Sequence, residues 1–533
     1  MFSTRALLAV FVVCATGPTV AVGAGAVSPN PTPAIAATVP NPVADGDAGE
    51  FVVLDLPSTT ANWTLGDGER VLSLPTDRPG TRVAVSADPN ATRRLTDTPV
   101  VSVPYLSLSN SGERLRLRRD GVVVATLTYR DAPEGERLVR TDDGTAWRPV
   151  GYQPRDVTRH GPATVTGFVL PDSPGLPVET LRSARHRLFL AGYTFTSERV
   201  AGALVAAERR GVDVRVLVDA DPVGGRTARG AAALDRLAAA GVDVAVLGGP
   251  RARFDYHHPK YAVVDDRALV LTENWKPAGV GGRSSRGWGA VVESSSLATD
   301  LAGLFRADSG WADALPWRRY RRGRTFETGE PAGASFPTRV EPTTTTASEV
   351  RVLTAPGNAG SALVGIIDGA DDRVDVIQPT VGGRSSPLLG ATVRAAERGV
   401  EVRLLLSGAW YVAEENAALV EWVNSVAERR GLPLTARVAE PGGRFEKIHA
   451  KGVVADDVVV VGSLNWNANA RTENREVAVA VRSEALAAHF REAFAADWRG
   501  GSGGGTTWLV IAGALAALVL AVVVARKTIR FGG

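Results

Sequence analysis

The sequence predicts a multidomain fold: an N-terminal immunoglobulin-like β-sandwich, two α/β lobes related by a pseudo-twofold axis, and one C-terminal transmembrane helix. Three observations support this. Short alternating apolar runs fill residues 50–154, two similar units lie between 165 and 498, and an uncharged apolar stretch occupies 506–525. A chain of 533 residues is long enough for several domains, and its 44% hydrophobic content indicates a globular protein.

The N-terminal residues 1–26 have the pattern of a secretory signal peptide. Arg5 precedes an apolar core, and small residues follow it. Cys14 is the one cysteine of the chain and lies inside that core, so the processed protein is expected to have neither disulfides nor a thiol nucleophile. Residues 27–49 are rich in Pro and Ala and are predicted to form a linker.

Residues 50–154 are predicted to form the β-sandwich. The runs "EFVVLDLP", "TRVAVSA" and "GVVVATLTY" are short and alternating, and clusters of Gly, Asn, Asp and Pro separate them. "NWTLGDGERVLSLP", followed by "LSLSNSGERLRLRRDGVVVATLTY", resembles a lamin-tail-like domain. That resemblance implies an immunoglobulin-type binding or spacing module without a catalytic motif.

Two copies of one α/β unit are predicted, as lobe 1 (165–325) and lobe 2 (349–498), joined by a linker at 326–348. "RGVDVRVLVD" in the first copy matches "RGVEVRLLLS" in the second, and each follows a helical stretch. The order strand, helix, strand, helix, strand is typical of an α/β fold with a mixed sheet. We therefore expect a monomer in which the two lobes form an internal pseudo-dimer.

The C-terminal region predicts a membrane anchor. After a Gly-rich linker at 499–505, residues 506–525 are long enough to span a bilayer as a helix. The basic tail at 526–533 would be cytoplasmic by the positive-inside rule, so the expected protein crosses the cell membrane once with its body outside. Without the leader and the tail the body is close to neutral, and its overall charge does not indicate a nucleic-acid partner.

One spaced pattern of polar residues occurs in both lobes, in "HHPKYAVVDDRALVLTENW" and in "HAKGVVADDVVVVGSLNW". Its members are His258, Lys260, Asp265, Thr272 and Asn274 in lobe 1, and His449, Lys451, Asp456, Ser463 and Asn465 in lobe 2. The offsets are the same in both copies, although the chain has only six His and its basic residues are mostly Arg. Two chance matches are not expected, so the pattern indicates function.

Two His, two Lys and two Asn at one axis suit the chemistry of a phosphodiester. Lys and Asn can hold the non-bridging oxygens as charge develops. One His can attack phosphorus while the other protonates the departing oxygen. No metal and no other cofactor is expected, because the Lys side chains supply the positive charge. His257 and His258 would also point to opposite faces of a strand.

With these motifs, and "TENREVAVAV" after the second, the chain resembles the phospholipase D superfamily. The resemblance covers both lobes and is closer in the second copy. It implies catalytic roles for His258 and His449 and structural support from Asp265 and Asp456. It also implies phosphate or substrate binding by the remaining members of the pattern, which are Lys260, Lys451, Asn274, Asn465, Ser463 and Thr272.

The chain departs from the family pattern in places. Leu271 replaces a Gly, and the spacer after each Asp is one residue shorter than usual. Glu476 matches the carboxylate that orients a catalytic His, whereas its counterpart near Trp288 is not acidic. The resemblance favours His258 as nucleophile and His449 as acid and later base. We expect Glu476 to hold His258 across the lobe interface; a bond to His449 within lobe 2 is the alternative.

The predicted function is a metal-independent phosphodiesterase that acts through a phosphohistidine, with nucleic acid as substrate. The resemblance to lamin-tail-like modules implies an association with nucleases, and the run Arg318–Arg324 is basic; this run fits a solvated linker edge better than a contact for a phosphate backbone or anionic headgroups. The first alternative is a phospholipase D or phosphatidyl transferase that acts on membrane lipid. The second is a catalytically weak surface binding protein that uses the sandwich.

Overall fold

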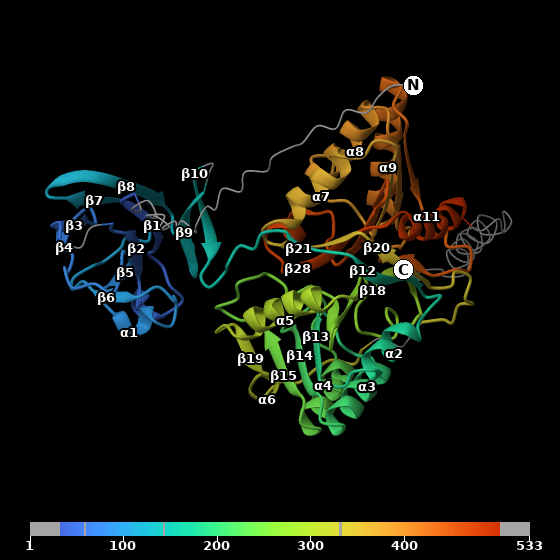
Figure 1. Cartoon of the computed structure of the whole chain (residues 1–533), viewed down its shortest axis with the longest axis horizontal. Helices are drawn as coiled ribbons and strands as arrows, with labels where there is room; N and C mark the ends of the chain where they lie inside the picture. Colours follow the sequence, from blue (N-terminus) through green and yellow to red (C-terminus); the bar gives the residue numbers. More distant parts are fainter. Residues whose placement is uncertain (1–31, 58–59, 142–143, 330–332, 501–533) are drawn as a thin grey trace, which may run out of the picture. The chain divides into compact units, whose positions relative to one another are not determined.

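The computed structural model describes residues 32–500 apart from 58–59, 142–143 and 330–332, and the chain forms two compact units (Figure 1). The first unit ends at Ala146, and the second contains the rest together with Glu134–Glu136. The predicted signal peptide and the apolar stretch 506–525 lie outside the described residues.

The N-terminal unit is built from two β-sheets, with strand orders β10-β9-β1-β2-β5-β6 and β4-β3-β7-β8. Its strands are β1 Ala34–Val39, β2 Phe51–Asp55, β3 Trp63–Gly66, β4 Val71–Ser73, β5 Arg82–Ser86, β6 Val100–Ser102, β7 Gly112–Arg119, β8 Val122–Arg130, β9 Glu136–Thr141 and β10 Gly144–Pro149; a 3₁₀ turn (Asp45–Asp47) and α1 (Pro89–Thr92) complete it. Buried residues of both sheets, such as Leu54 and Trp63, form its core. The lamin-tail resemblance stays a prediction.

The predicted linker 27–49 contains strand β1, so residues 34–39 belong to a sheet rather than to a linker. This strand pairs with both β2 and β9, so it is a central strand of its sheet. Ile35 and Val39 are fully buried there. The Pro residues that flank "AIAATV" gave the segment a linker composition, and a register shift between Ile35 and Ala37 interrupts the regular alternation that would mark a strand.

Lobe 1 is a mixed sheet in the order β19-β15-β14-β13-β16-β17-β18-β12-β20. Its elements are β12 Ala163–Leu170, α2 Leu176–Arg182, β13 Arg187–Gly192, α3 Glu198–Arg209, β14 Asp213–Asp219, α4 Ala228–Ala239, β15 Asp243–Leu247, β16 Tyr261–Val264, β17 Arg267–Leu271, β18 Ser285–Glu293, α5 Ser295–Ser309, β19 Ala314–Pro316, α6 Trp317–Tyr320 and β20 Thr343–Ala347. Parallel strands β13 to β15 adjoin antiparallel strands β16 to β18, as the repeat predicts.

Lobe 2 repeats this plan, with the order β11-β21-β28-β27-β26-β22-β23-β24. Its elements are β11 Thr158–His160, β21 Glu349–Ala355, α7 Ala359–Asp368, β22 Arg373–Gln378, α8 Pro387–Glu397, β23 Glu401–Leu406, α9 Ala413–Arg430, β24 Leu434–Val438, β25 Lys447–Ile448, β26 Gly452–Ala455, β27 Val458–Gly462, α10 Ala468–Thr472, β28 Glu476–Arg482 and α11 Glu484–Arg499. Strand β25 pairs with β18 of lobe 1.

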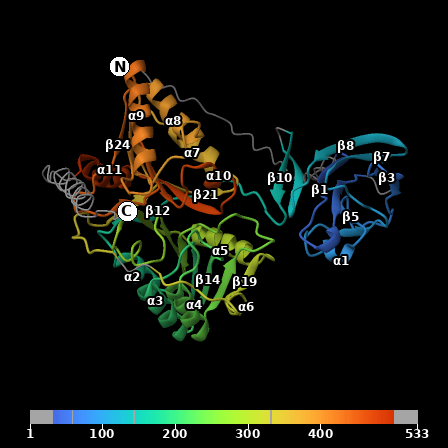
Figure 2. The same cartoon turned by 180° about the vertical axis from the view of Figure 1, so that it is seen from behind.

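The two lobes pack through a shared core that includes α5 and α11, while α2 to α4 cover the outer face of one sheet and α7 to α9 that of the other (Figures 1 and 2). Ser294 and Ser483 cap α5 and α11 in the same way, each accepting a backbone N–H three residues on. Trp288 of lobe 1 lies against Gly452 of lobe 2, where an added Cβ would come within 2.3 Å of the indole.

The lobe boundaries differ from the prediction because each end of the repeat exchanges a strand. Strand β20 comes from the predicted linker 326–348 and pairs with β12 in lobe 1. Strand β11 precedes the predicted start of lobe 1 at residue 165, yet it pairs with β21 in lobe 2. The run "TTTTA" of β20 is made largely of β-branched residues, which favour strands, but its Pro- and Thr-rich surroundings indicated a linker.

Two buried arginines at equivalent positions tie the lobes together. Arg286 of lobe 1 lies 2.7 Å from Asp497 of α11 and also pairs with Asp172. Arg475 of lobe 2 lies 2.8 Å from Asp308 of α5. Because all these side chains are buried, loss of one partner leaves an uncompensated charge, which fixes the two lobes in one relative arrangement.

The predicted fold class and localisation need correction where they include a membrane-spanning helix. Within residues 32–500 and their stated gaps, no helix is both long enough and apolar enough to cross a bilayer. The single-pass, membrane-anchored architecture is therefore not supported. The corrected fold class is two α/β lobes preceded by a β-rich region.

Candidate active site

The His–Lys motifs lie at the open ends of two equivalent β-hairpins, β16–β17 and β26–β27. His258 and Lys260 precede β16, and Asn274 follows β17. Because Tyr261 pairs with Val270 at this end of the hairpin, the motif and the Asn come close together. The second hairpin brings His449, Lys451 and Asn465 together in the same way. In each lobe, the carboxyl end of the neighbouring parallel strand lies beside the motif. The end of β13 pairs with the start of β16, and the end of β22 pairs with the start of β26.

Asp265 and Asp456 lie at the opposite ends of these hairpins, so the structure does not bring them to the His and Lys residues. Each forms its tight turn with a positive φ, 53° and 46°. Each carboxylate accepts three backbone N–H bonds at the start of a neighbouring strand, from residues 185–187 or 371–373. Burial opposes ionisation, but these bonds outweigh it and lower the pKa of both Asp side chains.

Thr272 and Ser463 contact the next strand of their own sheets. The Thr272 hydroxyl accepts the backbone N–H of Trp288, and the Ser463 hydroxyl accepts that of Val477 and donates back to its carbonyl. Both side chains are fully buried. These contacts fix the end of each hairpin.

The backbone of each motif histidine forms a hydrogen bond with the backbone of the other lobe. The His258 N–H donates to the carbonyl of Arg475 at 3.0 Å, and the His449 N–H donates to that of Arg286 at 2.9 Å. Arg475 and Arg286 are the arginines that pair with Asp308 and Asp497. The pseudo-twofold arrangement therefore brings both motifs to one place between the lobes.

The predicted contact of Glu476 with His258 across the interface is present. His258 Nδ1 lies 2.8 Å from both carboxylate oxygens of Glu476, which is fully buried and also accepts a bond from Asn474. The alternative, a bond to His449 within lobe 2, is not formed. Burial lowers the pKa of His258 to about 4, although Glu476 acts to raise it. The imidazole is therefore neutral at pH 7, with Nδ1–H held by the carboxylate and Nε2 unprotonated.

The second histidine has a carboxylate that the sequence analysis missed. His449 Nδ1 lies 3.2 Å from Glu273, an ion-pair distance that lacks hydrogen-bond alignment. The strand registers make Gly287 the equivalent of Glu476, and a Cβ at Gly287 would lie 2.3 Å from Glu273 Cγ. The absent side chain at residue 287 thus leaves room for Glu273. A residue-by-residue alignment of "TEN" with "SLN" would have shown the extra carboxylate.

The site contains two buried Lys side chains, Lys260 and Lys451, and among the described residues neither forms an ion pair with a carboxylate. Lys260 and Lys451 each donate to the carbonyl of their own motif's His at 2.6 Å. Burial lowers the pKa of Lys451 to about 7 and that of Lys260 well below its usual value. The negative charges of Glu476 and Glu273 act in the other direction and raise both pKa values. An anion bound between them would favour their charged forms.

Asn274 and Tyr193 also lie close to the His258 motif. The Asn274 amide is buried, and its Oδ1 has no hydrogen-bond partner in the described part of the chain. The Tyr193 ring stands edge-on to the His258 ring at 4.7 Å and lies under Lys260 at 5.4 Å. The described residues hold no group of three or more His, Cys, Asp or Glu side chains arranged for a metal ion.

Comparisons with solved structures find matches of low sequence identity. The chain is similar to phosphatidylserine synthase from Haemophilus influenzae (16% identity, 63% of this chain, 84% of that one, TM-score 0.47) and to Nuc from Salmonella typhimurium (21%, 30%, 98%, 0.25). It is also similar to polyphosphate kinase from Porphyromonas gingivalis (16%, 63%, 50%, 0.40). No curated protein matches the chain.

The family comparison is more direct. The model described as "Cardiolipin synthase, PLD-like domain" matches residues 178–309 and 363–498, one segment in each lobe. The two segments together make up half of the chain, and each contains one of the His–Lys motifs described above. The chain therefore belongs to the phospholipase D superfamily, with a PLD-like domain of the cardiolipin synthase type in two segments.

Proposed function

We propose that this protein is a phosphodiesterase or phosphoryl-transfer enzyme that works through a phosphohistidine on His258. The observation that carries the proposal is the bond between His258 Nδ1 and Glu476 across the lobe interface. A carboxylate in this position fixes the imidazole tautomer and stabilises the positive charge that develops when Nε2 attacks. Glu476 thus acts as the positioning residue for the nucleophile.

In the first step, the lone pair of His258 Nε2 forms a bond to phosphorus and the bond to the leaving oxygen breaks. His449 donates a proton to that oxygen. In the second step, His449 takes a proton from water or from an alcohol, whose oxygen attacks phosphorus and breaks the P–N bond. His258 and His449 return to their initial states, and the attacking molecule decides between hydrolysis and transfer.

Lys260, Lys451, Asn274 and Asn465 are proposed to hold the non-bridging phosphate oxygens. The two Lys side chains are buried, and among the described residues neither forms an ion pair, so a bound diester would give them a direct counter-charge. Because these cations belong to the chain, the chemistry requires no divalent metal. The hydroxyls of Thr272 and Ser463 bind strand backbone, so we assign them no contact with substrate.

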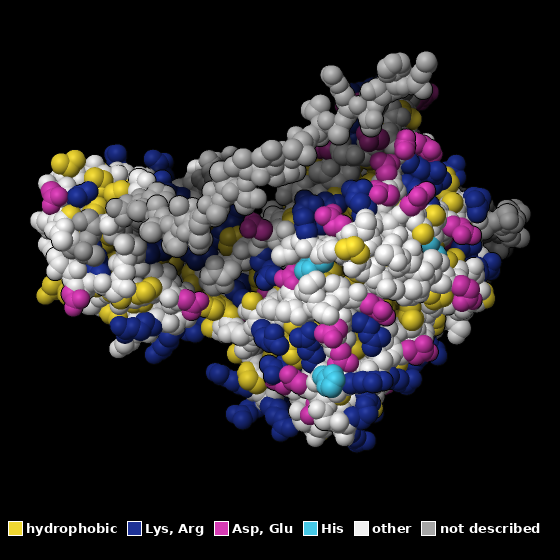
Figure 3. All heavy atoms as spheres, viewed as in Figure 1, with side chains coloured by type: hydrophobic (Ala, Val, Ile, Leu, Met, Phe, Trp, Pro, Cys, Tyr) yellow, Lys and Arg dark blue, Asp and Glu magenta, His cyan; other side chains and the backbone are white. Residues whose placement is uncertain are grey.

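A phospholipid is the substrate class that we propose first. The matched family model is of the cardiolipin synthase type. The basic run that favoured nucleic acid is largely occupied by internal contacts: Arg318 binds the Ala238 carbonyl, Arg321 pairs with Asp235 at 3.3 Å, and Arg324 lies over the Tyr320 ring. Figure 3 shows Lys and Arg side chains mixed with Asp and Glu on the face in view, rather than a continuous basic surface.

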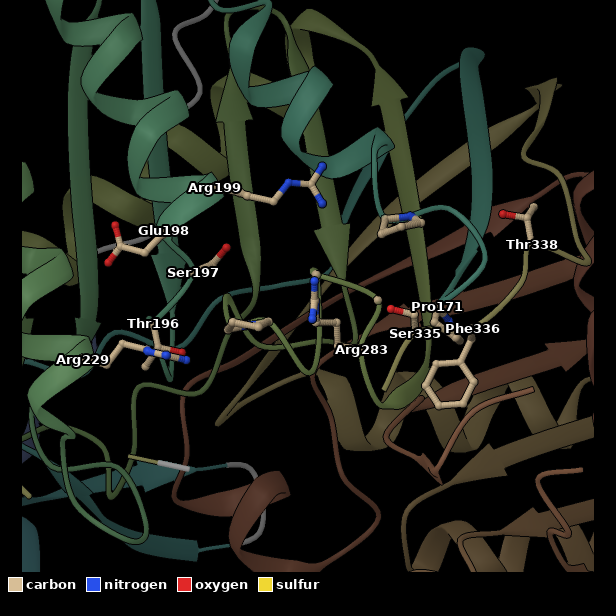
Figure 4. A pocket seen from close by; sticks show the side chains of 14 residues that line it. Pro171, Thr196, Ser197, Glu198, Arg199, Arg229, Arg283, Ser335, Phe336 and Thr338 are labelled. Carbon is tan, nitrogen blue, oxygen red and sulfur yellow. The ribbon is translucent and has the colours of Figure 1, made fainter. Parts of the chain in front are cut away.

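Nucleic acid is the second candidate, because one cavity in lobe 1 is rich in arginine. Arg199, Arg229 and Arg283 surround a cavity of about 460 Å³, together with Phe336 (Figure 4). Among the described residues, none of these three guanidinium groups has a hydrogen-bond or ion-pair partner. Such a cavity suits the phosphates of a polynucleotide backbone.

The test is an assay of the full chain with bis(p-nitrophenyl) phosphate, phosphatidylcholine and single-stranded DNA, with and without EDTA. We expect diester cleavage that persists in EDTA and that is lost in the His258→Ala variant. Phospholipid turnover above DNA turnover supports the first substrate class, and the reverse supports the second. Loss of all activity in EDTA with recovery in Mg²⁺ or Zn²⁺ would contradict the proposal.

A further inference from the structure

Lobe 2 exposes two aromatic side chains beside the His449 motif. In the loop between β23 and α9, Trp410 is 90% exposed and Tyr411 is 50% exposed. Large apolar side chains at such exposure on consecutive residues mark an interaction surface when they lie together. Lys447, two residues before His449, lies 5.3 Å from the centre of the Tyr411 ring. The aromatic pair therefore adjoins the entry of the second motif.

Lobe 1 exposes an apolar side chain in the equivalent loop. Val223 follows β14, the counterpart of β23, and is 77% exposed. Its backbone N–H donates to the Tyr193 hydroxyl, and the Tyr193 ring contacts His258. Val223, Trp410 and Tyr411, here called the rim residues, thus follow equivalent strands of the two lobe sheets, β14 and β23. Val223 reaches His258 through Tyr193, and Trp410 packs on Tyr411, which contacts Lys447 next to the second motif.

We propose that the rim residues dock on a phospholipid surface and bring its diesters to the site between the lobes. Trp and Tyr have an apolar ring with a polar edge and are the residues favoured at the headgroup level of a bilayer. Docking at both motifs would place the headgroup layer over the mouth of the site. The inference rests on the proposed function, because it names the surface on which the substrate is presented.

The charged side chains next to the rim residues favour binding to a zwitterionic lipid surface over binding to a polyanion. Lys447 is the cation beside Tyr411, but the exposed side chains of Glu414 and Glu415 follow in the first turn of α9. In lobe 1, the exposed Asp221 lies two residues before Val223. Carboxylates on both sides of the rim would repel a nucleic-acid backbone, while a zwitterionic headgroup offers both signs of charge.

Hydrogen–deuterium exchange of the full chain tests docking without any need for turnover. We expect phosphatidylcholine vesicles to slow exchange at residues 408–412 and 221–225 in the inactive His258→Ala protein, and single-stranded DNA to leave it unchanged. The same protein with Trp410→Ala added should lose this protection. Protection by DNA alone, protection by neither ligand, or full protection with Trp410→Ala would each overturn the proposal.

Kinetics then separate docking from chemistry. Trp410→Ala should lower turnover of vesicle phosphatidylcholine roughly tenfold, because the variant no longer buries a large aromatic side chain in the lipid. Hydrolysis of soluble bis(p-nitrophenyl) phosphate should stay within about twofold. The matched control is Tyr105→Ala, which removes a 75% exposed aromatic from the N-terminal unit and should change neither rate. Equal loss on both substrates would contradict docking, whereas wild-type chain inactive on both would contradict the proposed function.

Discussion

The two lobes build the same half-site but take its carboxylate from different positions, a strand in lobe 2 and the segment after a strand in lobe 1. Lobe 2 has Glu476 on β28 and Leu464 after β27, whereas lobe 1 has Gly287 on β18 and Glu273 after β17. Each carboxylate serves the histidine of the other lobe. Both half-sites have a carboxylate beside a His Nδ1, but the carboxylate comes from a different position in each lobe.

The two pairs also differ in strength. Glu476 forms an aligned bond of 2.8 Å with His258, while Glu273 lies 3.2 Å from His449 without such alignment. Burial raises the pKa of Glu273 to about 7, although nearby Lys side chains lower it. The well-held imidazole suits a nucleophile, and the loosely held one suits a group that must give and take a proton.

The largest expected effect is on catalysis in Glu476→Gln. An amide no longer fixes the tautomer of His258 or stabilises its positive charge, so kcat should fall roughly 10³–10⁴-fold. Steady-state kinetics with bis(p-nitrophenyl) phosphate measure this effect. Glu473→Gln is the matched control, because that nearby side chain is exposed, and it should stay within about twofold of wild type. A comparable fall of kcat in Glu473→Gln would contradict the specific role of Glu476.

The interface arginines predict an asymmetry in stability. Asp308→Asn leaves buried Arg475 without its carboxylate and should cost about 3–5 kcal/mol of unfolding free energy. Asp497→Asn should cost less, because Arg286 keeps its pair with Asp172 and Arg444, the other partner of Asp497, is only partly buried. Urea denaturation followed by tryptophan fluorescence compares the two variants. Equal losses, or a larger loss in Asp497→Asn, would contradict the reading of these contacts.

Relocation of the lobe 1 carboxylate tests the comparison itself. Glu273→Leu should lower kcat by roughly 10–10²-fold, since His449 loses the carboxyl group that shares the catalytic proton with it. Gly287→Glu alone should be destabilised, because the new side chain collides with Glu273. The double variant copies lobe 2 and should recover part of the activity lost in Glu273→Leu. A double variant no more active than the single one would show that the two positions are not equivalent.

The same pair predicts the pH profile. Glu273, with a pKa of about 7, holds a proton below that pH, and burial keeps the pKa of His449 well below its usual value. The pair therefore carries the proton for the leaving group below about pH 7 and loses it above, and Lys451 loses its charge in the same range. Activity should fall above pH 7 and also near pH 4, where His258 becomes protonated.

Glu273→Gln should move only the basic limb of this profile. The proton must then reside on His449 itself, whose low pKa places that limb at lower pH. The acid limb belongs to His258 and should stay in place. Rate measurements of kcat/KM from pH 3.5 to 9 decide this, and a shift of the acid limb in Glu273→Gln would contradict the assignment.

The smallest catalytic effect is expected for the turn aspartates, and it should be the same in both lobes. Asp265→Asn and Asp456→Asn weaken three backbone contacts each, so each should cost about 1–3 kcal/mol of stability. Because these residues lie at the far ends of the hairpins, kcat of the folded protein should change by less than about threefold. A large kcat loss without loss of stability would return them to the catalytic group.

The sequence identified most of the site because its two copies have identical offsets. His, Lys and Asn at fixed spacing fall at the open end of a hairpin in both lobes, and the cross-lobe contact of Glu476 was expected. Glu273 was missed because an acidic residue was sought at the strand position of Gly287. Only the tertiary structure shows that a missing side chain there makes room for a neighbour.

Strand exchange was also beyond the sequence patterns. Strand β20 has the composition of its Pro- and Thr-rich surroundings, and β11 spans only Thr158–His160. Both are edge strands, whose assignment depends on which sheet edge is free nearby rather than on local propensity. The predicted transmembrane helix at 506–525 lies outside the described residues, among which no helix is long and apolar enough to cross a bilayer.

The most direct test of the central claim is recovery of the phosphorylated peptide from the His449→Ala variant. With a p-nitrophenyl diester, the leaving group needs no protonation, so the first step proceeds while the second lacks its base. Digestion that avoids acid, followed by mass spectrometry, should find phosphate on His258, and His258→Ala should trap nothing. Phosphate in the peptide that contains His449, recovered from wild-type protein or from His258→Ala, would reverse the two roles and contradict the account.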